Sequence, residues 1–176
     1  SSMDQPAEVS VLEQGPLFVK VAVKGKIGKY SFTQTIRLTQ GEPRIDMSVK
    51  LDWTGNPRIG EPGIEFRADN PRKSFYDDRY KLLVYLPIQI ANQQIYKDAP
   101  FDVCESRLEN TFFNRWDSIK HNIILNWVDV ASKDNSCGLS LFTDHTTSYA
   151  HGKDFPLALN VQYAGKGLWG RDYIID

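Results

Sequence analysis

The sequence lacks the features that mark several large classes of protein. Its 176 residues carry a formal net charge of −1, and acidic and basic residues are interspersed, so there is no basic stripe of the kind that binds nucleic acid. No apolar run approaches the roughly 18–20 residues that span a bilayer. The two cysteines, Cys104 and Cys137, are too few for a disulfide framework and are typical of small buried residues, which leaves the redox compartment open. We therefore expect neither nucleic acid nor a membrane as partner.

Motifs for metal, nucleotide and serine chemistry are also lacking. The three histidines, His121, His145 and His151, form no i, i+4 pair and have no Cys-x-x-Cys partner, so their spacing favours no metal site. No serine stands in a Gly-x-Ser-x-Gly elbow, and the segment 25–28 lacks the second half of a phosphate loop. We expect no cofactor to be bound by these residues.

The strongest pattern is the run 44–53, R-I-D-M-S-V-K-L-D-W. Its apolar residues occupy alternate positions: Ile45, Met47, Val49, Leu51 and Trp53. This period of two is typical of a half-buried antiparallel strand, whereas a helix would scatter these side chains around its circumference. Because one strand cannot bury five large side chains alone, a second sheet must cover them. The pattern therefore predicts an all-β protein.

Weaker alternation predicts further strands on both sides of this run. Segments 8–14, 19–24 and 32–38 precede it with short glycine-marked connections, in which Gly25 and Gly28 bracket one turn, so we expect a four-stranded meander. Later strands are expected at residues 80–90, 94–96, 101–105, 121–131, 138–143 and 157–163. Pro87 lacks a ladder donor and predicts a strand end or a bulge, and residues 107–118 are expected to be irregular.

These strands predict one domain and two segments outside its regular structure. We interpret residues 1–5 as a disordered cloning remnant and residues 6–176 as a single β-sandwich domain. Residues 54–79 lose the alternation and form a long irregular insertion, of a length that tends to be functional. The apolar residues Ile174 and Ile175 close to the end lead us to expect that the natural chain continues.

Carboxylates and aromatic rings are the remaining candidates for chemistry. A glycosidase needs two carboxylates about 5–10 Å apart, whereas solvated loop charges are the commoner role of the candidates Asp52, Glu61, Glu65, Asp69, Asp77, Asp78, Asp129 and Asp144. Rings near strand ends stack on the apolar faces of sugars, whereas core packing is the commoner role of Trp116, Trp127, Trp169, Tyr149 and Phe155. Both interpretations stay open at this point.

An ordered series of motifs runs along most of the chain. It comprises E-x-G-P (13–16), T-Q-T-I-R-L (33–38), P-R-I-D-x-x-x-x-L-D-W (43–53), an apolar strand closing on proline (82–87), D-A-P-F-D-V-C-E (98–105), R-W-x-x-I (115–119), G-L-S-L-F-T-D (138–144), Tyr149, Gly152 and L-A-L-N-V (157–161). In order and spacing this series resembles the C-terminal β-region of glycoside hydrolase family 38 α-mannosidases.

The resemblance implies both a fold and a parent activity. The fold would be an antiparallel super-sandwich of the galactose-mutarotase-like kind, and the parent a retaining, zinc-dependent exo-α-mannosidase. In that family the nucleophile and the zinc ion belong to a separate N-terminal catalytic domain, which is the implied partner in the same chain. The fragment is therefore expected to lack a nucleophile, to hold no zinc itself and to be inactive alone, with a mannose-containing glycan as ligand.

In the family a hairpin of the β-region reaches the sugar site, and segment 143–146 best matches that hairpin. We carry over Asp144 and His145 as carbohydrate-binding residues, the plainer alternative being an exposed turn. The insertion at 54–79 departs from the family, whose members make a short connection there, and it bears on the linkage specificity.

Three rival hypotheses remain beside this one. A free-standing carbohydrate-binding sandwich would retain mannose affinity without a catalytic partner. The β-domain of another carbohydrate-active enzyme, such as a lyase or phosphorylase, would belong to a parent acting on another linkage. A structural spacer would do neither.

Overall fold

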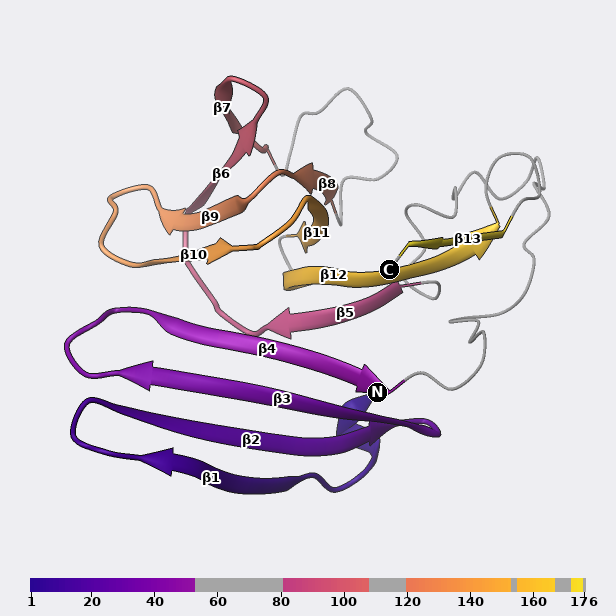
Figure 1. Cartoon of the computed structure of the whole chain (residues 1–176). Coiled ribbons are helices and arrows are strands. Elements are labelled where there is room, and N and C mark those ends of the chain that lie inside the picture. Colours follow the sequence, from indigo (N-terminus) through magenta and orange to yellow (C-terminus); the bar gives the residue numbers. More distant parts are fainter. Residues whose placement is uncertain (53–80, 108–119, 153–154, 167–171, 176) are drawn as a thin grey trace. The chain divides into compact units, whose positions relative to one another are not determined.

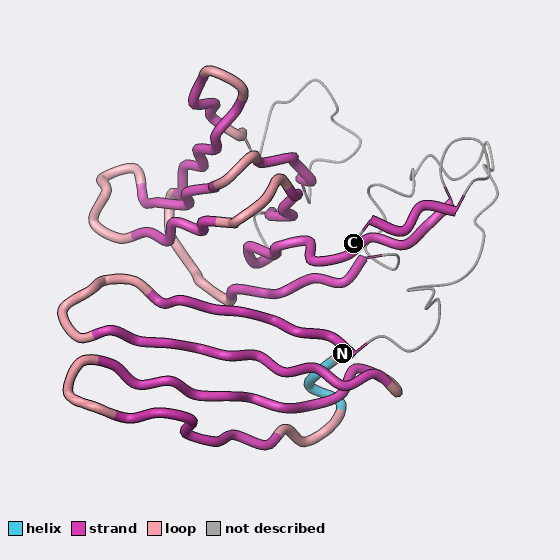
Figure 2. The backbone as a smooth tube through the Cα atoms, viewed as in Figure 1, coloured by secondary structure: helices cyan, strands magenta, loops and turns pink. Residues whose placement is uncertain are grey.

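The computed structural model describes residues 1–52, 81–107, 120–152, 155–166 and 172–175 of the chain. These residues form antiparallel strands and one short 3₁₀ turn (Figures 1 and 2), and none forms a helix long and apolar enough to cross a membrane. Three antiparallel sheets make up an all-β, sandwich-like fold, which confirms the predicted class. The insertion 54–79 and most of the segment 107–118 lie outside the described residues.

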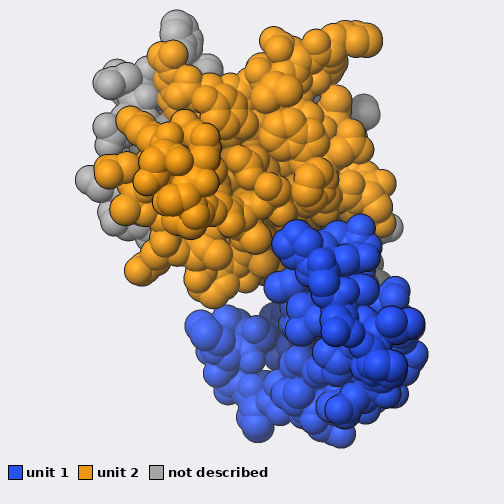
Figure 3. Space-filling view, turned by 90° about the vertical axis from the view of Figure 1, so that its left-hand side faces the viewer, with its two compact units in different colours: residues 1–57 blue, residues 58–176 orange. Residues whose placement is uncertain are grey.

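The chain divides into two compact units, Ser1–Pro57 and Arg58–Asp176 (Figure 3). We describe each unit by itself. The prediction that residues 6–176 form a single domain concerns the assembly of the two units and stays a prediction.

The first unit is one four-stranded meander, sheet 1, as predicted from the alternation. Its strands are β1 (Glu8–Gln14), β2 (Phe18–Ile27), β3 (Tyr30–Thr39) and β4 (Ile45–Asp52), which pair in chain order. Gly28 and Gly41 adopt φ angles of 59° and 77° in the β2–β3 and β3–β4 turns, a backbone region that glycine adopts at little steric cost.

The predicted turn between Gly25 and Gly28 is shorter than expected. Gly25 lies within β2 and pairs with Phe32 of β3, and a Cβ atom on Gly25 would come within 2.7 Å of the Phe32 ring. The glycine therefore leaves room for a cross-strand aromatic ring, and the strand continues to Ile27.

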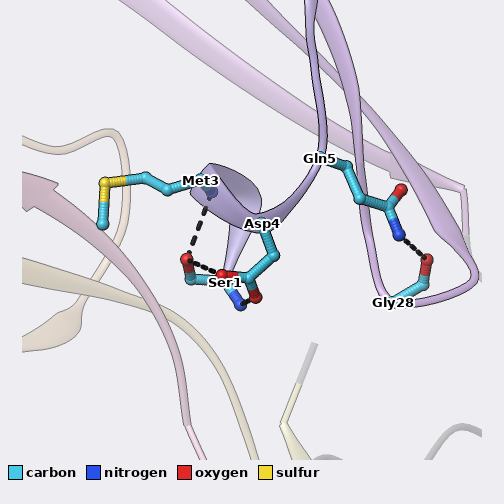
Figure 4. A network of polar contacts seen from close by, with 5 residues as sticks. All are labelled: Ser1, Met3, Asp4, Gln5 and Gly28. Carbon is cyan, nitrogen blue, oxygen red and sulfur yellow. Dashed lines mark hydrogen bonds and ion pairs between the residues drawn. The ribbon is translucent and has the colours of Figure 1, made fainter.

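The residues preceding β1 form a small polar network (Figure 4). Ser2–Asp4 make a 3₁₀ turn in which the amino group of Ser1 pairs with the Asp4 carboxylate. The Gln5 side-chain amide donates to the carbonyl of Gly28 in the β2–β3 turn over 3.4 Å. Residues 1–5, which we interpret from sequence as a cloning remnant, thus contact the meander.

One face of sheet 1 is mainly apolar, as the register shows. Val11, Val21, Ile36 and Met47 align across the four strands. The burial expected for the apolar face of β4 is wrong at its first residues, because Met47 is exposed and Ile45 remains 61% exposed. The described residues of this unit form a single sheet, and one sheet cannot by itself cover its own apolar face.

The second unit contains two sheets. Its strands are β5 (Lys81–Leu86), β6 (Gln93–Ala99), β7 (Asp102–Glu105), β8 (Lys120–Ile124), β9 (Trp127–Ser132), β10 (Gly138–Phe142), β11 (Thr147–Gly152), β12 (Phe155–Lys166) and β13 (Asp172–Ile175). Sheet 2 has the order β10-β9-β6-β7, and sheet 3 has the order β13-β12-β11-β8, with β5 paired to β12. Strand β5 ends before Pro87, as predicted.

One predicted strand of this unit is wrong. Residues 121–131 were expected to form a continuous strand, but the chain turns at Leu125 and Asn126, so that β8 belongs to sheet 3 and β9 to sheet 2. The backbone amides of both residues donate to the carboxylate of Asp98. A distant side chain therefore replaces the ladder partners that a continuous strand would have had.

The core of the second unit is built by both of its sheets. Ile95, Val128 and Val130 come from sheet 2, and Ile124, Tyr149 and Leu157 come from sheet 3. All six side chains are almost fully inaccessible to solvent. Lys97 of β6 adds a polar link, because its ammonium donates to the carbonyl of Ile123 in β8 over 2.8 Å.

Shortening a side chain of this core tests its contribution to stability. Leu157→Ala should lower the free energy of unfolding by about 2–5 kcal/mol, through lost apolar transfer and the cavity left behind. Ile123→Ala removes an exposed aliphatic side chain from the same unit and should change it by less than about 0.5 kcal/mol. Urea unfolding measures both values, and equal effects would contradict this assignment of the core.

Candidate functional site

The two predicted carbohydrate-binding residues lie in the connection between β10 and β11. The side chains of Asp144 and His145 are 95% and 65% exposed, and Asp144 Oδ1 lies 2.5 Å from His145 Nδ1. This contact and the charge of His145 lower the pKa of Asp144. The connection thus presents one preassembled pair, with Asp144 Oδ2 and His145 Nε2 outside this contact.

The strand end before this pair is fixed to the turn between β8 and β9. The backbone N–H of Thr143 donates to the carbonyl of Asn126 over 2.6 Å. The Thr143 hydroxyl lies 3.2 Å from that carbonyl and 2.9 Å from the carbonyl of His145. Thr143 therefore joins the exposed pair to Asn126 and limits the positions that the connection can take.

Asp98 fixes the turn in its place. Its buried carboxylate accepts the backbone amides of Leu125 and Asn126 at 2.9 and 2.6 Å and the side-chain amide of Asn126 at 3.2 Å. Burial alone would raise the pKa of Asp98, but the amides of Leu125, Trp127 and Asn126 outweigh it and hold the pKa below its ordinary value. The ionised carboxylate is therefore the stable form at neutral pH.

A second polar network lies in the interior of the unit, and sequence reasoning missed it. The Tyr149 hydroxyl donates to Ser106 Oγ over 2.6 Å, and the Asn122 side-chain amide reaches the same oxygen over 3.1 Å. Burial raises the pKa of Tyr149. The ring that seemed suited to stacking on a sugar is therefore part of the core. Its partners come from two other segments, so no local pattern marks the network.

His151 is buried in the same strand as Tyr149. Its side chain is only 3% exposed, and its Nε2 lies 3.0 Å from Gln93 Oε1, which accepts and thereby favours the Nε2–H tautomer. Nδ1 has no hydrogen-bond partner of good geometry among the described residues. Burial lowers the pKa of His151, and the backbone carbonyls of Phe155 and Pro156 offset this shift only in part.

The remaining sequence candidates are scattered. Phe155 packs edge-on against Tyr85, with ring centroids 5.6 Å apart. Trp127 is half-buried on β9, two residues before Asp129. The carboxylates from Glu61 to Asp78, together with Trp116 and Trp169, lie outside the described residues. Within the part of the chain that the structure describes, no three His, Cys, Asp or Glu side chains gather as a metal site requires.

Removing one carboxylate oxygen tests the role of Asp98. Asp98→Asn leaves a buried backbone amide without an acceptor and should lower the free energy of unfolding by about 1–3 kcal/mol at neutral pH. Because the pKa is lowered in the folded protein, this stabilisation is present above the ordinary value of 3.8 and is lost as the pH falls through the folded value. The difference in urea midpoint between the wild type and the variant should therefore shrink in acid. Asp102→Asn, on an exposed carboxylate, is the matched control, and an equal loss there would contradict the assignment.

His151 should make the second unit sensitive to acid. Because its pKa is lowered on folding, its contribution is present above the ordinary value of 6.5 and declines as the pH falls toward the folded value. The urea midpoint of the wild type should fall between about pH 7 and pH 5, and His151→Gln should flatten this dependence. His145→Gln, in an exposed position, should leave the slope in place. An unchanged slope in His151→Gln would refute the prediction.

Comparison with known proteins identifies the family of this chain. No curated protein and no solved structure gives a significant match to the chain. The family model described as the glycosyl hydrolases family 38 C-terminal domain matches residues 1–160, which include sheets 1 and 2, Asp98 and the connection at 143–146. Because this match covers most of the chain and agrees with the series of motifs, the chain belongs to the family of glycosyl hydrolase family 38 C-terminal domains.

Proposed function

We propose that this chain is the non-catalytic β-domain of a retaining, zinc-dependent exo-α-mannosidase. The observation that carries the proposal is the family match over residues 1–160. Membership makes the chain a β-domain of a glycoside hydrolase and implies association with a catalytic domain of the same chain. In this proposal the catalytic domain supplies the nucleophile and the zinc ion, and the β-domain packs on it and helps to shape the sugar site.

The described residues give no reason to place zinc in this chain. A zinc site needs three or four nitrogen, sulfur or carboxylate ligands at short distances, and the described side chains form no such group. We therefore assign no step that involves the metal to these residues.

Asp144 and His145 are the residues through which the β-domain would contact the sugar. With Nδ1 bound to Asp144, the imidazole keeps Nε2 for a ligand, and the carboxylate offers its second oxygen. Two polar atoms on one exposed turn suit neighbouring hydroxyl groups of a mannose ring, each of which can donate or accept a hydrogen bond. The links from Thr143 to Asn126 and from Asn126 to Asp98 support this geometry, since they restrain the turn before substrate binds.

Hydrolysis of an aryl α-mannoside by the full-length protein tests the proposal. Activity should be present with zinc and absent after chelation. Asp144→Ala and His145→Ala should each raise KM by about five- to twentyfold, which corresponds to one hydrogen bond of about 1–2 kcal/mol. Both positions are exposed, so thermal unfolding should not change.

Two results would count against this proposal. A metal-loaded protein without activity would refute the mannosidase assignment. Kinetics of Asp144→Ala and His145→Ala equal to those of Asp102→Ala, an exposed carboxylate elsewhere in the second unit, would refute the role of the pair.

A further inference from the structure

The two faces of sheet 2 carry different chemistry. In β9 the side chains alternate between buried and half-buried, with Val128 and Val130 turned into the core. The opposite face, which we call the outer face, is more exposed than the inner face on β10, β9 and β7, and on β6 it carries the half-buried Gln94 and Tyr96 and the buried Asp98. The strand order β10-β9-β6-β7 can be followed in Figure 1. The core accounts for the inner face, and the outer face has so far no role.

A row of polar side chains crosses the outer face. The register aligns Ser140 of β10 with Asp129 of β9, Asp129 with Tyr96 of β6, and Tyr96 with Glu105 of β7. Directly paired residues of antiparallel strands point to the same side, so the four side chains stand next to one another. Two carboxylates and two hydroxyl groups thus form a continuous line across all four strands.

The Ser140 hydroxyl donates to Asp129 Oδ1 over 2.6 Å, which orients this carboxylate. Its second oxygen, Oδ2, takes no part in that hydrogen bond. At the other end of the row, Glu105 Oε2 lies 3.6 Å from Arg107 Nε. The row therefore presents mostly acceptors, held in place from within the sheet.

A pair of aromatic rings borders this row on one side. Phe142 of β10 pairs directly with Trp127 of β9, and Phe142 is 72% exposed. Adjacent to them, the buried Asp98 pairs with the exposed Val103 of β7. The next row beyond the polar one, on the side away from the rings, contains Gly138 and Ala131 paired with each other.

Gly138 and Ala131 have small side chains, so little projects from the sheet beside the polar row. A Cβ atom on Gly138 would come within 3.0 Å of the carbonyl of Val130 and 3.1 Å of Ala131 Cβ, so the position does not readily accept a larger residue. Gln94, which pairs with Ala131, turns its amide to Asn135 over 3.1 Å. The outer face thus carries three adjacent rows: the aromatic pair, the polar row and a row of small residues.

We propose that this outer face binds a neutral oligosaccharide through Phe142, Trp127, Asp129 and Ser140. The apolar face of a pyranose ring stacks on the aromatic border, and its hydroxyl groups donate to the carboxylates of the polar row. This binding uses residues other than the pair Asp144–His145, and it goes beyond the proposed function, since it requires no hydrolysis.

The chemistry of the surface favours this ligand over the other macromolecules. Nucleic acids and anionic lipid surfaces need basic side chains, whereas the polar row contains the carboxylates Asp129 and Glu105, the latter paired with Arg107. The centre of a protein–protein interface is depleted in charged residues, whereas charged residues occupy the centre of this face. A neutral polyol with hydroxyl donors is complementary to acceptors beside exposed rings.

Affinity electrophoresis of the full-length protein tests the proposal without turnover. Gels contain soluble α-mannan or a soluble mixed-linkage glucan, with a zinc chelator throughout. The wild type should be retarded by at least one of them. Phe142→Ala should weaken this affinity about tenfold, the effect of losing one stacked ring, and Asp129→Asn should weaken it several-fold. Phe101→Ala, which removes a fully exposed ring at the tip of the β6–β7 hairpin, should have the affinity of the wild type.

The outcomes separate this proposal from the mannosidase assignment. No retardation of the wild type by either polysaccharide would overturn it, as would equal retardation of the wild type and Phe142→Ala. A lower melting temperature of Phe142→Ala with unchanged glycan affinity would assign the face to contacts within the protein and overturn it as well. Failure to hydrolyse an aryl α-mannoside would refute only the mannosidase assignment, because retardation is measured with the metal removed.

Discussion

The buried carboxylate of Asp98 is the interaction on which the arrangement of the second unit depends. An ionised group is costly to bury unless hydrogen bonds replace its lost water, and the backbone amides of Leu125 and Asn126, with the Asn126 side chain, do so here. In accepting them, Asp98 ends β8 and begins β9, so the chain passes from sheet 3 to sheet 2 at this point. The same turn offers the carbonyl of Asn126 to Thr143, which leads to the exposed pair.

The sequence predicts well what depends on local period. Alternation in β1 to β4 specifies four strands with short turns, because successive side chains of a strand lie on opposite faces of its sheet. It fails at residues 121–131, where a segment rich in strand-forming residues conceals a change of sheet. The determinant of that change, Asp98, is 27 residues away from Leu125 in the chain, and no pattern within the run could reveal it. Ile45 fails for the opposite reason: alternation gives the apolar face but not the layer that covers it.

The candidate functional residues divide in the same way. Asp144 and His145 are found through the resemblance to family 38, and their contact with each other follows from being neighbours on an exposed turn. The role of an aromatic residue is ambiguous in the sequence, since Tyr149 and Trp127 could equally be core or surface rings. Tyr149 is buried because Ser106 and Asn122 satisfy its hydroxyl from distant segments, whereas Trp127 stays half-exposed beside Phe142. Only the register between strands separates the core ring from the surface ring.

Sheet 2 therefore combines two requirements that usually compete: stability of the fold and an exposed polar surface. Its inner face supplies apolar burial, and the connections at its ends are held by Asp98 and Thr143, so much of its stability comes from the core and from these connections. The outer face can consequently carry acceptors and an exposed ring, groups that contribute little to folding and lose little by staying in water. Asp98 is the exception on this face, since it pairs with Val103 yet is buried. Carboxylates that a sheet holds in place on a solvent-exposed face need little rearrangement when hydroxyl groups bind to them.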